Sequence, residues 1–506
     1  MSITAAEQYL IELINRGRLD PLAEAERYNL DLNADLPAGT IGVDALQVLS
    51  PNSTLHDAAV DHSLWMLAEN TFGHTGVDQS SPGQRMEWAG YAFEGRWSWS
   101  ENLAWFGTTG QISLAAAILA HHEGLYRSSG HRANTFGENI NEIGVAQEVG
   151  SFTADGTTYN SSMLTEQFAS SGSDVYVTGV AYTDTDGDQF YSIGEGQSDV
   201  WFRAGVNDAS TQTAGGYGLS VGEVDTVTVE IGQGAESFGS VQLDMSLGNV
   251  KLDLVTTADG GQMLATSGNM TLGDGIDDAV LLGSADLALV GNDADNILTG
   301  NRGNNEISGG DGRDVLHGGA GSDTLNGGNL GDQLHGGAGR DVLHGGLGYD
   351  RLYGGSYHDR LYGEIGNDRL YGGGGNDRMS GGNGHDRLYG GNANDRLYGN
   401  NGADRLAGGN GNDHLNGGRG DDIMTGGSGA DQFVFNAGAD RITDFQDDLD
   451  VILISGRLTD ATDAAAVLAN AEIVDGTAII YFDGGNRLTI DNIDSLDQLL
   501  DDIVII

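Results

Sequence analysis

Residues 350–373 read DRLYGGSYHDRLYGEIGNDRLYGG, and Asp350, Asp359 and Asp368 recur in this stretch every nine residues. A helix repeats its faces every 3.6 residues and a strand every two, so neither element explains the period. Sixteen such units follow one another without insertion from residue 291 to residue 434. Their consensus is G-G-x-G-x-D-x-U-x, where U is a large apolar residue. This repeat decides the fold of the C-terminal part.

Position eight of every unit is apolar, from Leu298 in the first unit to Phe433 in the last. In a short x-U-x strand only the middle side chain points inward. The six glycine-rich residues that follow turn the chain toward a second sheet, so two units complete one coil. A low-complexity linker is the alternative, but a linker would not keep a nine-residue frame through sixteen units.

Position six is Asn296 and Asn305 in the first two units and Asp in the fourteen that follow. Carboxylates offer only acceptor oxygens, and glycine lets carbonyl oxygens approach an ion, so stacked units predict oxygen cages that favour Ca²⁺ over zinc or copper. The predicted calcium ligands are Asp314, Asp323, Asp332, Asp341, Asp350, Asp359, Asp368, Asp377, Asp386, Asp395, Asp404, Asp413, Asp422 and Asp431. The two Asn units predict a weakly metallated cap.

The repeat resembles the RTX (haemolysin-type) calcium-binding nonapeptide, which implies a parallel β-roll. Leu330, Tyr357 and Ala393 depart from the pattern because each replaces the glycine at position four. Without calcium the carboxylates repel one another and the small core does not offset the chain entropy. We therefore expect a chain that is disordered at cytosolic calcium and folds outside the cell.

Outward-facing residues of the repeat also recur at eighteen-residue intervals. Tyr353, Tyr371 and Tyr389 would lie on one sheet beside Arg351, Arg369 and Arg387, and Tyr362 and Tyr398 on the other beside Arg360, Arg378 and Arg396. Such ladders could bind a polyanion or a glycan, or could cover a narrow roll and offset the carboxylate charge. We favour the second interpretation.

Residues 435–506 close the chain. The stretch DQFVFNAGADRITDFQDDLDVILI resembles the segment that caps such rolls. The ending DQLLDDIVII, acidic and then apolar, resembles the uncleaved signal of type I secretion, which implies a type I secretion exporter as partner. A terminal strand over residues 503–506 would have the same composition.

The first residues, MSITAAEQYLIELINRGR, lack the basic region and unbroken apolar core of an N-terminal signal peptide. They instead predict a helix that is capped by Thr4 and Glu7 and stopped by Gly17. We therefore expect a secreted, extracellular or cell-surface protein without an N-terminal signal peptide.

Composition limits the function further. The formal net charge of −51 would repel nucleic acids and anionic membranes, so we expect no nucleic-acid partner. No apolar run reaches the ~18 residues of a transmembrane segment. The chain has no Cys and thus no disulfides, and its 506 residues predict roughly three domains at ~150 residues each.

Five motifs occur in series within residues 1–172: DHSLWMLAENTFGHTG, SPGQRMEWAGY, ENLAW, RSSGHRAN and EIGVA. Together they resemble the bacterial branch of the CAP superfamily (SCP-like; cysteine-rich secretory protein, antigen 5 and pathogenesis-related group). The resemblance implies an α-β-α sandwich with a cleft that holds His and Glu side chains and sometimes a divalent metal. The lack of Cys departs from the disulfide-bonded animal and plant members.

By motif, His74, Glu101 and His131 match the cleft residues of this superfamily and are the catalytic candidates. Neutral imidazoles at His74 and His131 would suit Zn²⁺, with Glu101 orienting a water. The family's further glutamate falls in HHEGLYRSS, where Glu123 is a weaker candidate. We expect His62 to be a buried hydrogen-bonding residue, and the five Trp residues between 65 and 105 to pack in the core rather than line the cleft.

Residues 173–258 alternate as short strands and predict a small β-sandwich, with a hairpin around Gly248 and Asn249. In DTDGDQFYSIGE, the acidic residues Asp184, Asp186, Asp188 and Glu195 occupy places one, three, five and twelve of a calcium loop. Gly187 stands at place four rather than six, so we expect a variant loop; a plain acidic turn is the alternative. Residues 259–290 would lead into the roll.

The sequence thus predicts a multidomain α+β protein: a CAP-like α-β-α sandwich, a middle β-sandwich, a parallel β-roll over 291–434 and a cap over 435–506. Two functions remain open. The CAP-like domain would bind an extracellular lipid, glycan or peptide, or it would be a metal-dependent peptidase or esterase with Glu101 as general base. No nucleophile, base and orienting group stand together in the sequence, so we favour binding.

Overall fold

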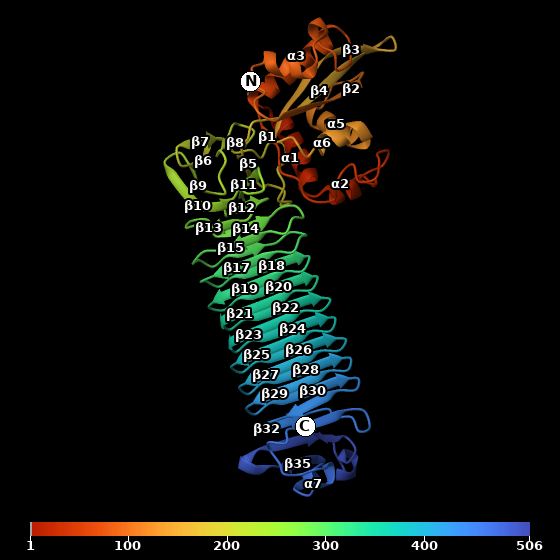
Figure 1. Ribbon diagram of the computed structural model, residues 1–506, viewed down its shortest axis with the longest axis vertical. Coiled ribbons are helices and arrows are strands. Elements are labelled where there is room, and N and C mark those ends of the chain that lie inside the picture. The colour runs from red at the N-terminus through yellow and green to blue at the C-terminus, as the bar shows by residue number, and fades with distance from the viewer. Residues whose placement is uncertain (1–2) are drawn as a thin grey trace. The chain divides into compact units, whose positions relative to one another are not determined.

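The computed structural model describes residues 3–506, and the chain divides into two compact units, residues 1–285 and 286–506 (Figure 1). The first unit holds a helix-covered sheet and a β-sandwich, and the second is a β-roll with a cap. The multidomain α+β class is therefore confirmed, including its α-β-α, sandwich and roll components.

The N-terminal part of the first unit contains one four-stranded sheet with the order β1-β3-β4-β2. Its strands are β1 (Ser50–Pro51), β2 (Trp97–Thr108), β3 (Glu142–Ala154) and β4 (Thr157–Ser171). Its helices are α1 (Ala5–Leu19), α2 (Pro21–Arg27), α3 (Ser53–Ala68), η1 (Val77–Gln79), α4 (Pro82–Trp88), α5 (Leu114–Arg127) and α6 (Ser129–Thr135). β4 pairs antiparallel with both β2 and β3.

Helices cover both faces of this sheet. On one face, α1 and α5 pack on β3 and β4 through a core that includes Leu10, Ile118 and Phe168. On the other face, α3 lies so close to β3 that a Cβ on Gly144 would overlap the backbone of Leu55 and His56. The alternating strands thus present their two faces to two separate apolar cores.

Helix α1 begins as expected, because Thr4 and Glu7 form a capping box. The expectation that Gly17 stops the helix is wrong, since α1 continues to Leu19. A Cβ at Gly17 would lie 3.1 Å from the side chain of Glu24 and 3.5 Å from that of Phe136, so this glycine serves close packing rather than termination.

The middle β-sandwich consists of two sheets with the orders β7-β6-β9-β10-β13 and β8-β5-β11-β12-β14. The strands of the first sheet are β6 (Val200–Ala204), β7 (Asn207–Ser210), β9 (Thr226–Gln233), β10 (Glu236–Asp244) and β13 (Met270–Leu272). Those of the second are β5 (Tyr176–Thr183), β8 (Gly216–Ser220), β11 (Val250–Thr256), β12 (Gln262–Thr266) and β14 (Asp278–Leu281). The sandwich therefore includes strands from the predicted lead-in.

The predicted hairpin around Gly248 and Asn249 is wrong, because β10 and β11 belong to different sheets. The turn instead carries the chain from one sheet to the other. The Asn249 side chain donates to the carbonyls of Val48 and Asn141, 3.0 and 2.7 Å away. These long-range bonds outweigh the local turn preference that the sequence showed.

A buried ion cluster also joins the helical part to the sandwich. The only lysine of the chain, Lys251 on β11, lies 2.6 Å from a carboxylate oxygen of Glu12 on α1 and 2.5 Å from one of Asp253. All three residues are buried. Residues 1–172 and the sandwich therefore pack as one unit.

The second unit is a roll of two parallel sheets (Figure 1). One sheet contains β15 (Ala288–Val290), β17 (Glu306–Gly310), β19 (Thr324–Asn329), β21 (Val342–Gly348), β23 (Arg360–Gly366), β25 (Arg378–Asn383), β27 (Arg396–Asn401), β29 (His414–Arg419), β31 (Gln432–Phe435), β33 (Val451–Ile454) and β37 (Ile503–Ile505). The other contains β16 (Ile297–Thr299), β18 (Val315–Ala320), β20 (Gln333–Ala338), β22 (Arg351–Ser356), β24 (Arg369–Gly374), β26 (Arg387–Asn392), β28 (Arg405–Asn410), β30 (Ile423–Ser428) and β32 (Ala439–Ile442).

Neighbouring repeat strands are offset by eighteen residues, as in the pairing of Leu352 with Leu370, so two units make one coil. The apolar residue at position eight of every unit is at most 2 % exposed. Each unit thus contributes one side chain to a narrow continuous core.

The cap follows the last repeat. Its elements are α7 (Ala464–Leu468), β34 (Ala471–Val474), β35 (Thr477–Tyr481), η2 (Asp483–Gly485), β36 (Arg487–Asp491), η3 (Leu496–Leu499) and β37. β36 pairs with β32, and β37 pairs parallel with β33 at the end of the other sheet. The last residues therefore form the terminal strand that their composition also allowed.

Candidate functional site

Stacked aspartates run through the turns of the roll. At each Asp of position six, one carboxylate oxygen accepts the backbone N–H of the residue eighteen positions earlier, as Asp368 does from Asp350 at 2.9 Å. The same bond recurs in every coil, and these aspartates are only 1–2 % exposed. The fourteen predicted calcium ligands are thus brought into two regular rows.

The second oxygen, Oδ2, of each of these fourteen carboxylates is buried and accepts no hydrogen bond. A buried carboxylate oxygen without a donor or a cation is strongly unfavourable. Carbonyl oxygens lie beside it: a Cβ at Gly372 would be 2.6 Å from the carbonyl oxygen of Gly390 and nearer still to Oδ2 of Asp377. Position one must therefore be glycine, and the oxygen-only surroundings fit Ca²⁺.

Without a bound metal, the pKa values of these buried aspartates are raised, as expected for carboxylates that lack a cation. Burial raises the pKa of Asp368 to about 8, although the N–H of Asp350 opposes the shift and the carboxylates of Asp350 and Asp386 add to it. Burial likewise raises the pKa of Asp332 to about 7. Because the folded state holds these protons more tightly than the unfolded chain, the metal-free roll loses stability as the pH rises from about 4 to about 8. A bound cation would remove this penalty at neutral pH.

From the third unit on, position two and, except at Gly366, position four have a left-handed backbone. The non-glycine residues there also have positive φ angles: 74° at Leu330, 77° at Tyr357, 77° at Ala393, 71° at Glu364 and 74° at Asn400. The departures from the repeat consensus thus keep the turn geometry, at a cost in local strain.

The first two units differ at position six. The side-chain amide of Asn305 bonds within its own turn, accepting from the N–H of Asn301 at 2.8 Å and donating to its side chain at 3.1 Å. An amide satisfied in this way offers little to a cation.

The acidic loop after β5 gathers three of its four predicted ligands. Oxygens of Asp184, Asp186 and Asp188 lie within 4.8 Å of one another. Glu195 does not join them, because its oxygens accept from the N–H and hydroxyl of Thr185 and from the N–H of Ser192. Partial burial raises the pKa of Asp188, as do the carboxylates of Asp186 and Asp184, against a hydrogen bond from the N–H of Phe190.

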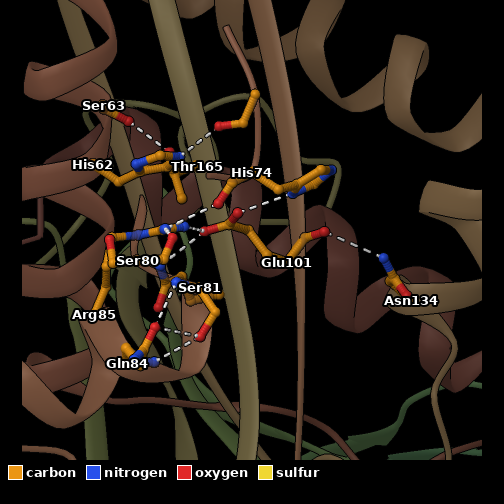
Figure 2. Close-up of polar contacts among 12 residues, drawn as sticks. His62, Ser63, His74, Ser80, Ser81, Gln84, Arg85, Glu101, Asn134 and Thr165 are labelled. Atoms are coloured by element: carbon orange, nitrogen blue, oxygen red, sulfur yellow. Dashed lines mark hydrogen bonds and ion pairs between the residues drawn. The ribbon is translucent and has the colours of Figure 1, made fainter. Parts of the chain in front are cut away.

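Figure 2 shows the site in the helical part, where His74 and Arg85 both point at Glu101 on β2. Nδ1 of His74 lies 2.9 Å from Oε1 of Glu101, and Nη2 of Arg85 lies 2.5 Å from Oε2. Gln167 on β4 donates to the same Oε2 at 3.1 Å. The Glu101 side chain is 1 % exposed, whereas that of His74 is 55 % exposed.

Because a carboxylate only accepts hydrogen bonds, Nδ1 of His74 must carry the proton. The side chain is half exposed and Nε2 makes no hydrogen bond within residues 3–506, so Nε2 is the ring atom available to a ligand. Glu101 is buried and both of its oxygens are engaged, so it holds His74 in place and does not reach water as a general base. Arg85, which supplies the buried counter-ion, was not among the sequence candidates; it stands in the quoted SPGQRMEWAGY motif.

His131 on α6 lies at the edge of the same region, and Asn102 donates to its carbonyl oxygen at 3.1 Å. Burial lowers the pKa of the His131 imidazole, and the nearby His74 adds to this effect. Glu123 instead forms an exposed pair with Arg127 and does not face Glu101. No third His, Asp or Glu joins His74 and His131 as a metal ligand among residues 3–506.

His62 is buried, as expected, and bonds to the carbonyl of Gly73 at 3.0 Å. The expectation that the tryptophans pack in the core is wrong for Trp88, Trp97, Trp99 and Trp105, which are 37–61 % exposed. Trp97 and Trp99 line a shallow groove of about 300 Å³ together with Phe93. An aromatic surface therefore lies on the same strand as Glu101.

We expect Arg85→Met to destabilise the first unit by about 3 kcal/mol, because it leaves the buried Glu101 carboxylate without its cation. The matched control Arg127→Met removes an exposed pair and should cost less than about 1 kcal/mol. Urea unfolding followed by Trp fluorescence measures both, since all six tryptophans lie before residue 202. Equal costs would show that the Arg85 pair is not a structural element.

Comparison with known proteins begins with the repeats. Residues 290–325, 326–356, 353–388, 380–415 and 407–442 match the family of the RTX calcium-binding nonapeptide repeat (4 copies). The C-terminal repeats are RTX repeats. No curated protein matches this chain significantly.

Two solved structures share a remote likeness. One is an extracellular protein containing a SCP domain from Bacillus anthracis str. Ames, with 22 % identity over 30 % of this chain and a TM-score of 0.18. The other is the extracellular lipase LipA from Serratia marcescens, with 16 % identity over 45 % of this chain and a TM-score of 0.21. This chain covers 39 % and 40 % of those chains, and likenesses this weak support no inference.

The RTX aspartate row extends one coil beyond the predicted ligands. Oδ1 of Asp440 accepts the N–H of Asp422 at 3.1 Å, and its Oδ2 is buried without a partner. Asp450 accepts from Asp431 in the same way at 2.9 Å. The signal for Asp440 was present, because Gly438, Asp440 and Ile442 keep positions four, six and eight of a unit that lacks its first two glycines.

Proposed function

We propose that the chain is a secreted protein whose RTX repeats fold around calcium outside the cell. The row of buried, unpartnered Asp Oδ2 atoms supports this proposal most strongly, because only a bound cation would stabilise it at neutral pH. The loop of Asp184, Asp186 and Asp188 would hold a further calcium ion in the sandwich. None of the helices in residues 3–506 is long and apolar enough to span a membrane.

Export would use a type I secretion exporter that recognises the C-terminal residues as its signal. We expect deletion of residues 497–506 to retain the protein inside cells that coexpress such an exporter, whereas the full chain reaches the medium. Immunoblots of cells and medium measure the distribution.

Because β37 pairs with β33, the deletion also removes part of the cap. Circular dichroism of the truncated protein in calcium separates loss of the signal from loss of folding. Normal export of the truncated chain would refute the signal assignment.

For the first unit we propose a CAP-like domain that binds an extracellular lipid, glycan or peptide. The observation that supports it is the exposed His74 imidazole, which the buried Glu101 and Arg85 pair fixes in one orientation; Glu101 stands on the strand that also carries exposed Trp97 and Trp99. Such a rigid polar group next to aromatic faces suits ligand recognition.

Zinc calorimetry on the calcium-saturated full chain tests this proposal against a metal-dependent hydrolase. A catalytic zinc needs about three protein ligands, so we expect no tight zinc binding that depends on His74 and His131. Tight binding that is lost in both His74→Ala and His131→Ala would favour the hydrolase. If no such zinc binding is found, the same variants serve as controls in a screen of lipids, glycans and peptides.

A further inference from the structure

A groove of about 960 Å³ runs along the outer face of the roll beside β23, β25, β27 and β29. One side carries Arg360, Arg378 and Arg396 at position seven, and the other carries Asn376, Asn394 and Asn412 at position five. We call it the arginine groove. The aspartates of position six also line it, but they are nearly fully buried and contribute its floor.

The three arginines stand directly beside one another on neighbouring parallel strands. Strands lie about 4.8 Å apart, and like charges in register repel across such a step. None of the three forms an ion pair with a carboxylate within residues 3–506. Arg378 lies over the ring of Tyr398, 5.2 Å from its centroid. Their guanidinium groups are therefore not engaged by a carboxylate of the chain at ion-pair distance.

The asparagine row is equally ordered. Oδ1 of Asn376 accepts the N–H of Asn394, Oδ1 of Asn394 accepts that of Asn412, and Oδ1 of Asn412 accepts that of Ala430, at 3.1, 2.7 and 2.9 Å. These bonds fix the orientation of each amide. The three residues are exposed, and their NH₂ groups donate no hydrogen bond within residues 3–506, so the row offers donors to a ligand.

The arginine groove thus presents cations along one side and neutral donors along the other, repeated at each coil. A complementary ligand is a chain with an anionic group on each unit along one edge and hydroxyl or ether oxygens along the other. We propose that the groove binds a linear acidic polysaccharide, with carboxylate or sulfate groups on the arginines and sugar oxygens on the asparagine amides.

Nucleic acid fits the groove less well. The net charge of −51 acts on nucleic acid and on an acidic polysaccharide alike, so the lining of the groove has to distinguish them. A single strand needs aromatic faces for its bases. The groove offers the small imidazoles of His358 and His414 and one larger ring, Tyr398, which Arg378 covers. On the other sheet Tyr353, Tyr371 and Tyr389 stack on one another at 4.9 and 5.0 Å.

The proposal requires the calcium-folded roll, so the test uses the full chain at saturating calcium with folding checked by circular dichroism. The probe is a fluorescent oligogalacturonate too short to gel with calcium, measured by anisotropy at low salt. A heparin oligosaccharide distinguishes sulfate from carboxylate recognition, and neutral dextran controls for the sugar alone.

The test variant is Arg360→Gln/Arg378→Gln/Arg396→Gln. The matched control, Arg351→Gln/Arg369→Gln/Arg387→Gln, makes the same charge change at the same repeat position on the other sheet. We expect the test variant to bind roughly a hundredfold more weakly or worse, because each charge-assisted contact is worth about a factor of ten. The control should bind as the unmodified protein does.

Loss of calcium-dependent folding would refute the calcium proposal rather than this one. A folded protein that binds neither acidic oligosaccharide would overturn the polysaccharide assignment. Equal losses in the two triple variants would show general charge attraction without a groove. Tighter binding of single-stranded DNA of equal charge would assign the groove to nucleic acid instead.

Discussion

Removal of calcium with a chelator is expected to unfold residues 291–434 while residues 1–285 stay folded. Fourteen buried carboxylates would then face one another without a cation, and a core of one apolar side chain per unit cannot offset both the repulsion and the chain entropy. Circular dichroism of the full chain should lose the part of its β signal that the roll contributes, while the strands of the first unit keep theirs, and the lost part should return at millimolar calcium. Limited proteolysis should cut the repeats and spare the first unit.

Magnesium provides the control for this experiment, because it prefers a rigid octahedral site with several retained waters and should not restore the signal at the same concentration. An unchanged spectrum in chelator would refute calcium-driven folding. Cleavage throughout residues 1–285 would show instead that the first unit depends on the roll.

Substitution of one glycine should remove a calcium site. In Gly372→Ala the new methyl group would occupy the space between Oδ2 of Asp377 and the carbonyl oxygen of Gly390, where the cation is expected. We expect at least one fewer bound calcium per chain and a calcium midpoint of folding raised by about tenfold, equivalent to roughly 1.4 kcal/mol per ion lost. Calcium titration followed by circular dichroism and equilibrium dialysis measure these two changes.

Gly374→Ala is the matched control within the same unit. The nearest atom to a Cβ there is the carbonyl oxygen of Gly355 at 4.0 Å, and the φ angle of Gly374 is not in the left-handed region. This variant should keep the calcium number and midpoint of the unmodified protein. If the two variants behave alike, position one has no special part in the calcium site.

The roll was predictable because its information is local and repeated. Each nine-residue unit contains its own turn glycines, its aspartate ligand and its buried apolar residue. The period of nine therefore predicts the coil, in which Leu352 pairs with Leu370. Asp440 was not predicted because the repeat pattern is incomplete around it. Its unit lacks the glycines by which the repeat was recognised, although the backbone geometry and the carboxylate remain.

Long-range contacts decided the features that the sequence did not predict. The turn at Gly248 has the chemistry of a hairpin, yet the bonds from Asn249 to Val48 and Asn141 place its strands in different sheets. The candidate site illustrates the same limit. The motifs placed His74 and Glu101 together correctly, but the buried charge of Arg85 and the exposure of Trp97 follow only from tertiary packing.

The hydrogen bonds between successive aspartates give the roll a folding polarity. Each aspartate N–H donates to a carboxylate that stands later in the chain, so a coil is complete only when its C-terminal neighbour is in place. Asp440 and Asp450 supply the acceptors for the last two repeat aspartates from within the cap. We therefore expect coils to add from the cap toward the N-terminus, so that a roll shortened at its N-terminal end folds where one shortened at the other end fails.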